Sequence, residues 1–209
     1  MATYGDLQAR IADEIVRSDL TTQIQNAILT SVLEFDRERW YFNETAFNTS
    51  TVIAQREYTS TNITNTLQID TIKMTIVAGT VYDLQPRSYE EIEVLTSGST
   101  AVDSGQPTFY AYFNQQISLF PIPDSAAYTF RVVGAKKLTE LAAAGDSNAW
   151  TNDAEPMIRA RAKWHLYTHV IKDQAQASLM NDTFLQNYTA LRALTTDRGT
   201  RGRLKATRF

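Results

Sequence analysis

The stretch Thr71-Ile72-Lys73-Met74-Thr75-Ile76 decides the fold, because its apolar and polar side chains alternate. Alternation with a period of two, in residues rich in β-branched side chains, predicts a strand buried on one face. Ala78-Gly79 separates this strand from Thr80-Val81-Tyr82-Asp83-Leu84, and the two stretches together predict a β-hairpin. Twelve of the 36 residues from Thr45 to Thr80 are serine or threonine, so the surrounding segment also favours strands.

More strand patterns follow further along the chain. They cover 108–113, 117–120 and 128–133, and Pro121-Ile122-Pro123 predicts an extended edge or a turn between the last two. Ser88 and Glu91 have the spacing of a capping box, which predicts a short helix to about Leu95, and the polar stretch 96–105 predicts an exposed loop. Several short strands separated by turns predict a small antiparallel β-sandwich or barrel.

The N-terminal segment has helical periodicity instead. One apolar stripe contains Tyr4, Leu7, Ile11 and Ile15, with spacings of three or four residues. A second stripe, also at helical spacing, consists of Leu20, Ile24, Ile28, Val32 and Phe35. Ser18 and Asp19 lie between the stripes and are both favourable N-cap residues. The pattern predicts two helices joined as an αα-hairpin.

The C-terminal third returns to helical periodicity. Asn152 and Glu155 form a cap signal, and Pro156 is acceptable in a first helical turn. The stripe that follows has spacings of three and four residues and consists of Met157, Ala160, Trp164, Tyr167 and Ile171. After Asn181-Asp182 a last helix is expected, whose stripe contains Phe184, Tyr188 and Leu191.

We therefore predict an α+β protein in which the terminal helices form an antiparallel helical bundle around an inserted, small antiparallel β-sandwich or barrel module. The expected helical bundle covers 1–42 and 151–196, and the β-rich module covers 43–140. Residues 197–209 form a basic C-terminal tail, in which Gly199 and Gly202 predict an extended peptide.

Composition excludes several classes of protein. The chain of 209 residues contains no cysteine, which excludes thiol nucleophiles, disulfides and thiolate metal sites. It has neither an apolar run of membrane-spanning length nor a signal-peptide core, so we expect a soluble protein made in the cytoplasm, without membrane contact. Charge is unevenly distributed: residues 1–191 contain 14 Lys/Arg and 22 Asp/Glu, a net of −8, whereas residues 192–209 contain six and one, a net of +5.

Catalytic signatures are weak. The sequence has no phosphate-binding loop, dinucleotide fingerprint or nucleophile elbow. His165, His169 and Asp173 are spaced by four, which places them on one helix face able to hold a metal, yet Leu166 occupies the position where a zincin has glutamate. The pair Glu90-Glu91 could act in acid–base catalysis, but negative charge also suits the start of a capped helix. We expect that the protein is not an enzyme and binds neither a cofactor nor a metal. The alternative is a metal-dependent cell-wall hydrolase that uses the two histidines.

The basic tail has three interpretations. It could bind nucleic acid as an accessory factor, it could dock in a groove of a protein partner, or it could be a solvated terminus. Leu204 and the terminal Phe209 are apolar anchors, which suit a protein groove better than a phosphate backbone. From the residues alone the chain is best interpreted as an assembly or binding protein.

Several motifs together resemble the head-to-tail adaptor, or connector, proteins of tailed bacteriophages. The similar segments extend over nearly the whole chain: 4–15, 17–20, 34–44, 84–91, 105–112, 119–124, 148–151 and 157–164. The first begins Tyr4-Gly5-Asp6-Leu7, and the last reads Met157-Ile158-Arg159-Ala160-Arg161-Ala162-Lys163-Trp164.

The resemblance implies a structural virion protein at the head–tail junction, which forms a ring of usually twelve copies beneath the portal protein. Its helices would surround the DNA channel, and its β-rich insertion would face the next tail component, a nozzle, tube or stopper protein. The segment expected to dock on the portal consists of Arg198, Arg201, Arg203, Leu204, Lys205, Arg208 and Phe209. An acidic lumen would let the genome slide past without adhering.

Within such a ring, we expect neighbouring subunits to meet through helix faces of opposite charge. The basic face contains Arg159, Arg161 and Lys163. The acidic face contains Glu34, Asp36 and Glu38. Charge at the rim of such a contact sets register more than affinity.

Overall fold

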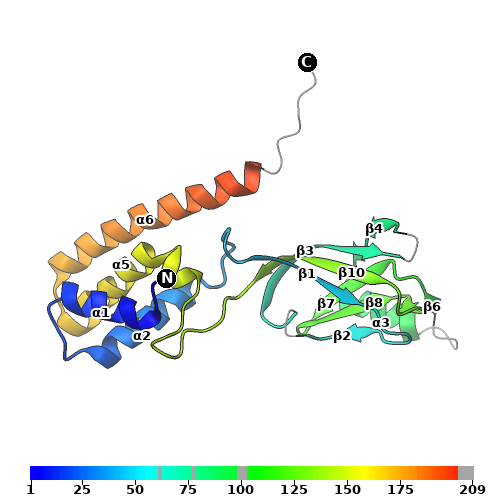
Figure 1. Cartoon of the computed structure of the whole chain (residues 1–209), viewed down its shortest axis with the longest axis horizontal. Helices are drawn as coiled ribbons and strands as arrows, with labels where there is room; N and C mark the ends of the chain where they lie inside the picture. The colour runs from blue at the N-terminus through cyan, green and yellow to red at the C-terminus, as the bar shows by residue number, and fades with distance from the viewer. Residues whose placement is uncertain (61–62, 77–78, 98–102, 202–209) are drawn as a thin grey trace, which may run out of the picture. The chain divides into compact units, whose positions relative to one another are not determined.

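The computed structural model describes residues 1–60, 63–76, 79–97 and 103–201. The chain divides into two compact units (Figure 1). The helical unit comprises Met1–Asn43 and Leu138–Phe209, and the β unit comprises Glu44–Lys137. Helices and antiparallel sheets are thus combined in one chain, which confirms the predicted α+β class. Among the described helices, none is both long and apolar enough to cross a membrane.

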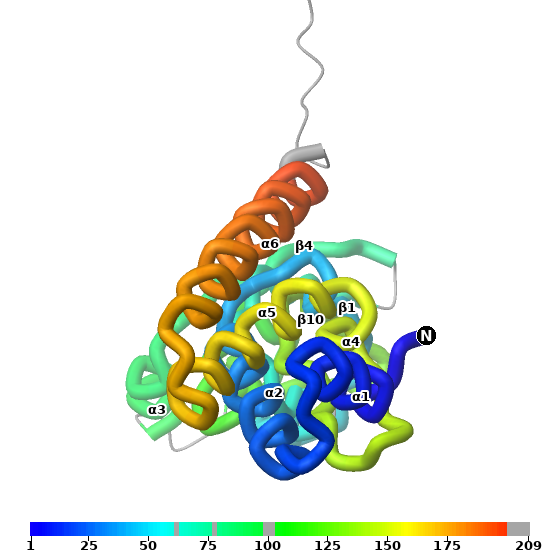
Figure 2. The backbone as a smooth tube through the Cα atoms, turned by 90° about the vertical axis from the view of Figure 1, so that its left-hand side faces the viewer, coloured from blue at the N-terminus to red at the C-terminus, as the bar shows by residue number. Residues whose placement is uncertain are grey.

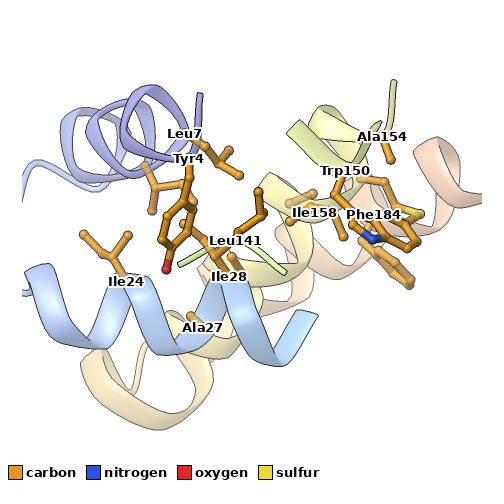
Figure 3. Packing of buried hydrophobic residues seen from close by; sticks show 14 of the residues in the cluster. Tyr4, Leu7, Ile24, Ala27, Ile28, Leu141, Trp150, Ala154, Ile158 and Phe184 are labelled. Carbon is orange, nitrogen blue, oxygen red and sulfur yellow. The ribbon is translucent and has the colours of Figure 1, made fainter. Parts of the chain in front are cut away.

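The helical unit packs its helices around one core. Its elements are α1 (Tyr4–Glu14), α2 (Thr21–Phe35), α4 (Ala149–Asn152), α5 (Glu155–His165), the π-helix η1 (Leu166–Ile171) and α6 (Gln174–Arg201). Helix α5 contacts both α2 and α6 and lies between them (Figure 2). The predicted stripes meet in the core, where Tyr4 and Leu7 lie across from Ile24 and Ile28 (Figure 3).

Two predicted helix caps are wrong, because other groups bind the capping side chains. The carboxylate of Asp19 accepts both of its hydrogen bonds from Arg17, at 2.8 Å each, so α2 begins after Leu20 without a side-chain cap. Asn152 is the last residue of α4 and donates its side-chain amide to the carbonyl of Asn148. Asn148 is the actual cap of α4, and α5 begins three residues after Asn152, at Glu155.

The predicted break at Asn181-Asp182 and the predicted extended peptide at Gly199 are also wrong. Helix α6 is continuous from Gln174 to Arg201. The carboxylate of Asp173 caps its N-terminus by accepting the amides of Ala175 and Gln176, at 3.1 Å each. One glycine costs a helix only about 1 kcal/mol, and α6 continues through Gly199 to Arg201.

The β unit contains two four-stranded sheets. The first has the order β1-β10-β3-β4 and is antiparallel throughout. The second has the order β2-β8-β7-β5, with β5 parallel to β7, and a separate parallel pair joins β6 to β9. The strands are β1 (Glu44–Ser50), β2 (Glu57–Tyr58), β3 (Thr66–Thr75), β4 (Val81–Asp83), β5 (Gln85–Pro86), β6 (Ser104–Gly105), β7 (Phe109–Phe113), β8 (Gln116–Phe120), β9 (Ile122–Pro123) and β10 (Thr129–Lys136). The predicted hairpin and the three later strands are confirmed as β3–β4, β7, β8 and β10.

The two larger sheets share one core, to which β3 and β10 of the first sheet contribute together with β7 and β8 of the second. Within β8, Ile117 belongs to this core, whereas Phe120 packs with Ile92 of α3 (Tyr89–Ser97) on the other face. The second sheet is therefore covered on both faces. Within the described residues each sheet keeps two free edges, so the architecture is a sandwich and the predicted alternative of a closed barrel is excluded.

The predicted capping box of α3 is confirmed. The amide of Glu91 donates to Oγ of Ser88 at 3.2 Å, and the amide of Ser88 donates to the Glu91 carboxylate at 3.0 Å. Each side chain thereby satisfies a backbone donor that the first helical turn leaves free.

Candidate interaction surfaces

The basic residues of α5 form two rows, each directed at another helix of the same unit. Arg159 and Lys163 both bind the carboxylate of Glu14 in α1, at 2.7 and 2.6 Å. Arg161 binds Glu34 of α2 at 2.6 Å. Residues four apart share a helix face, so Arg159 and Lys163 are directed at one acidic partner and Arg161 at another. The predicted basic face is therefore neutralised within its own chain.

The residues of the predicted acidic face are also buried or bound within their own chain. Asp36 is buried, while the carboxylate of Glu38 binds the guanidinium of Arg192 in α6. That guanidinium also lies over the rings of Trp40 and Tyr188, 4.5 and 5.4 Å from their centroids. This anchor of α6 was not predicted, because the sequence places Glu38 and Arg192 at opposite ends of the chain. A contact of these charged faces with a neighbouring subunit stays a prediction.

The two histidines lie beside a small groove of about 240 Å³ between α2 and η1. The ring of His165 is 2.9 Å from the Glu34 carboxylate, and the centroids of the two histidine rings are 6.0 Å apart. Burial lowers the pKa of His165, against the opposing effect of Glu34. The helix becomes π-helical at Leu166 and ends at Ile171, so the prediction that Asp173 shares one helix face with the histidines is wrong. The part of the chain that the structure describes holds no group of three metal-ligating side chains.

A larger groove of about 640 Å³ lies on the β unit, between α3 and Phe109 of β7. Val94 and Leu95 line it and are 70% and 43% exposed. Of the carboxylates considered for catalysis, Glu91 holds the helix cap and lies 3.8 Å from Arg87. The capping box predicted α3, but nothing in the sequence shows which of its apolar residues face the solvent.

The predicted docking segment begins within α6. The guanidinium of Arg198 lies 3.9 Å from the ring centroid of Tyr41, whose hydroxyl donates to Asp153 at 2.7 Å. Arg201 is the last residue of the helix. The remaining predicted docking residues, Arg203, Leu204, Lys205, Arg208 and Phe209, lie outside the described residues.

Comparison with known proteins identifies a family whose sequence model covers nearly the whole chain. The sequence model of the SU10 adaptor protein family matches residues 2–207, whereas no curated protein matches. This match supports a structural, non-enzymatic role as a phage adaptor, a virion component that contacts other virion proteins. Because the matched segment includes both the helical unit and the β unit, the chain belongs to the SU10 adaptor protein family.

Proposed function

We propose that this protein is a ring-forming adaptor that joins the portal vertex of the capsid to the tail and lines the DNA channel. The observation that carries the proposal is the family match over residues 2–207, together with the resemblance to head-to-tail adaptors in many separate segments. In this role the twelve copies of the expected ring form a structural connection and catalyse no reaction. The portal protein binds one part of the ring, and a nozzle, tube or stopper protein binds another.

The C-terminal segment is the proposed portal latch. Helix α6 is fixed to the other helices by the buried Leu191 and by Arg192, which binds Glu38. Beyond these anchors, the predicted docking segment from Arg198 to Phe209 combines basic charge with the apolar anchors Leu204 and Phe209. Such a segment fits an acidic groove with apolar pockets, as a cleft between two portal subunits could provide.

Co-sedimentation with the portal ring of the same virus tests the latch. A chain that ends at Arg201 loses the last eight residues but keeps α6. Ending the chain at Leu191 is a poorer test, because it removes Arg192 and thereby leaves Glu38 without its cation. We expect the full chain to bind stoichiometrically and the chain ending at Arg201 not to bind.

Two full-length variants separate charge from apolar anchoring: one replaces Arg203, Lys205 and Arg208 by serine, and the other replaces Leu204 and Phe209 by serine. Equal binding by the chain ending at Arg201 would exclude the latch. Failure of the full chain to bind would place the protein away from the portal. Salt-sensitive DNA binding that depends on the last eight residues would instead support a nucleic-acid accessory role.

The lateral contact of the ring is proposed to use the faces of opposite charge. Arg161 and Glu34 are 19% and 29% exposed in their side chains, so they could contact a neighbour while keeping their intrachain pair. Reversal of Glu34 to Lys should disrupt ring assembly on the portal. If the contact lies between subunits, mixing this variant with Arg161→Glu subunits restores mixed rings, whereas an intrachain role is restored only by both changes in one chain.

The acidic charge of residues 1–191 is proposed to line the channel and to keep DNA mobile. Replacing exposed carboxylates by their amides, in groups of three or fewer, should slow DNA ejection from assembled particles. Ejection at an unchanged rate in every group would exclude this explanation of the charge.

A further inference from the structure

One edge strand of the β unit is unusually open. Strand β1 forms the edge of the first sheet and pairs with β10 over seven consecutive residues, without a register shift. Edge strands are usually protected from other chains by bulges, proline or lysine. The sequence of β1, Glu-Thr-Ala-Phe-Asn-Thr-Ser, has neither proline nor lysine. Within the described residues, the outer side of β1 therefore offers a template for pairing.

The direction of the backbone groups follows from the neighbouring hydrogen bond. The amide of Thr51 donates to the carbonyl of Tyr128 at 2.9 Å, so Thr51 faces β10. Because backbone direction alternates along a strand, Thr49, Phe47 and Thr45 also face β10. The N–H and C=O groups of the residues between them point away from the sheet, and the side chains of Ala46, Asn48 and Ser50 are exposed.

The strand is also self-complementary. When a second copy of β1 is placed antiparallel about a two-fold axis at Phe47, Glu44 lies opposite Ser50, and Ala46 lies opposite Asn48. In the same arrangement Thr45 lies opposite Thr49, and Phe47 lies opposite itself. No like charges meet, and aromatic and threonine pairs of this kind stabilise antiparallel strands. The outward residues Ala46 and Asn48 become the hydrogen-bonded pair, as an antiparallel ladder requires.

We propose that β1 is a dimerisation edge, at which two copies of the free protein join their first sheets into one continuous sheet. Phe47 packs against the core of the β unit, so the two-fold pair would also bring the rims of the two cores together. The opposite edge of the sheet is a weaker candidate, because β4 is only three residues long. A two-fold contact cannot be the repeated contact of a ring, so this pairing is a separate contact and the inference does not rest on the proposed function.

Engineered cysteines test the register, since the natural chain contains no cysteine. Opposed residues that are not hydrogen-bonded to each other have Cα atoms about 4.5 Å apart, which a disulfide can span. We expect a mixture of Thr45→Cys and Thr49→Cys proteins to form a disulfide-linked dimer under mild oxidation. Either variant alone should not, because about four strand residues, or roughly 13 Å, separate each cysteine from its own symmetry copy.

A proline substitution tests the pairing itself. In Asn48→Pro, the lost N–H is one that points away from β10, so the sheet of the single chain keeps its hydrogen bonds. By symmetry the change removes two hydrogen bonds from the dimer, which should weaken dimerisation by about tenfold or more in sedimentation equilibrium. The mixed cysteine dimer and this loss together support the proposal. A wild-type protein that stays monomeric at high concentration, a dimer without the mixed crosslink, or a crosslink in either single variant would overturn it.

Discussion

A substitution at Gly134 tests whether the two units unfold separately. It lies in β10 beside a shift in register with β3. A Cβ atom added to Gly134 would lie 2.0 Å from the carbonyl oxygen of Gln68 and 3.1 Å from Cα of Ile69. Because carbon and oxygen atoms need about 3.3 Å, Gly134→Ala must push the backbones of β3 and β10 apart by roughly 1 Å.

We expect Gly134→Ala to destabilise the β unit by about 3 kcal/mol, from overpacking and from weakened ladder hydrogen bonds. For a unit of this size, that change corresponds to a fall in melting temperature of roughly 10–20 °C. The matched control is Gly145→Ala, where a Cβ atom would meet nothing within 4 Å. The control should stay within about 0.5 kcal/mol of the wild type.

The chain itself separates the signals of the two units. All three tryptophans, Trp40, Trp150 and Trp164, lie in the helical unit, so tryptophan fluorescence follows only that unit during urea unfolding. Circular dichroism at a β-sensitive wavelength follows both. In Gly134→Ala the fluorescence midpoint should stay unchanged while part of the circular dichroism signal is lost at lower urea. An equal shift in both signals would refute separate unfolding, and no shift in either would refute the steric argument.

Three further changes have defined outcomes. Gly199→Ala should stabilise the end of α6 by about 0.5 kcal/mol, seen as slower amide exchange in its last turns, since a Cβ atom there meets nothing within 4 Å; faster exchange would contradict it. Ser88→Ala should cost about 1 kcal/mol and expose the amide of Glu91 to exchange, because the capping box is lost; unchanged exchange would show that water replaces the cap. The pKa of His165 is lowered by burial despite Glu34, so the unfolded chain binds a proton first and stability falls as pH drops below about 6.5. His165→Gln should remove part of this fall, measured by urea unfolding followed by tryptophan fluorescence, and an identical pH dependence in the variant would contradict the assignment.

The elements with strong periodicity could be predicted because side-chain spacing reports which face is buried. Leu7 and Ile28 are in the helical core, and Ile72 is in the β core, as their stripes indicate. Helix boundaries were harder to predict, because a capping side chain can bind another group. Asp19 is a residue type that favours the N-cap position, yet Arg17 binds its carboxylate.

Packing between distant segments explains the errors in α6. Local rules favour a break at Asn181-Asp182, but Phe184 stacks on Phe35 with ring centroids 5.4 Å apart. The sequence shows neither this contact nor its energy, since α2 and α6 are far apart along the chain. The ion pairs of the candidate surfaces could not be predicted for the same reason. The sequence shows that Arg161 and Glu34 have opposite charges, but not that they bind each other within one chain.

The anchors of α6 decide which of its basic residues remain for a partner. Arg192 binds Glu38 and stacks on Trp40, so its charge stabilises the helical unit. Arg198 stacks on Tyr41 but has an exposed side chain, and a cation over an aromatic ring keeps its charge. From Leu191 to Arg201 the helix rises about 15 Å, so its C-terminal end lies well beyond the last core residue. We therefore expect basic charge in this part of the chain to have two separable roles: a variant at Arg192 should lower stability, whereas variants from Arg203 onward should change only binding.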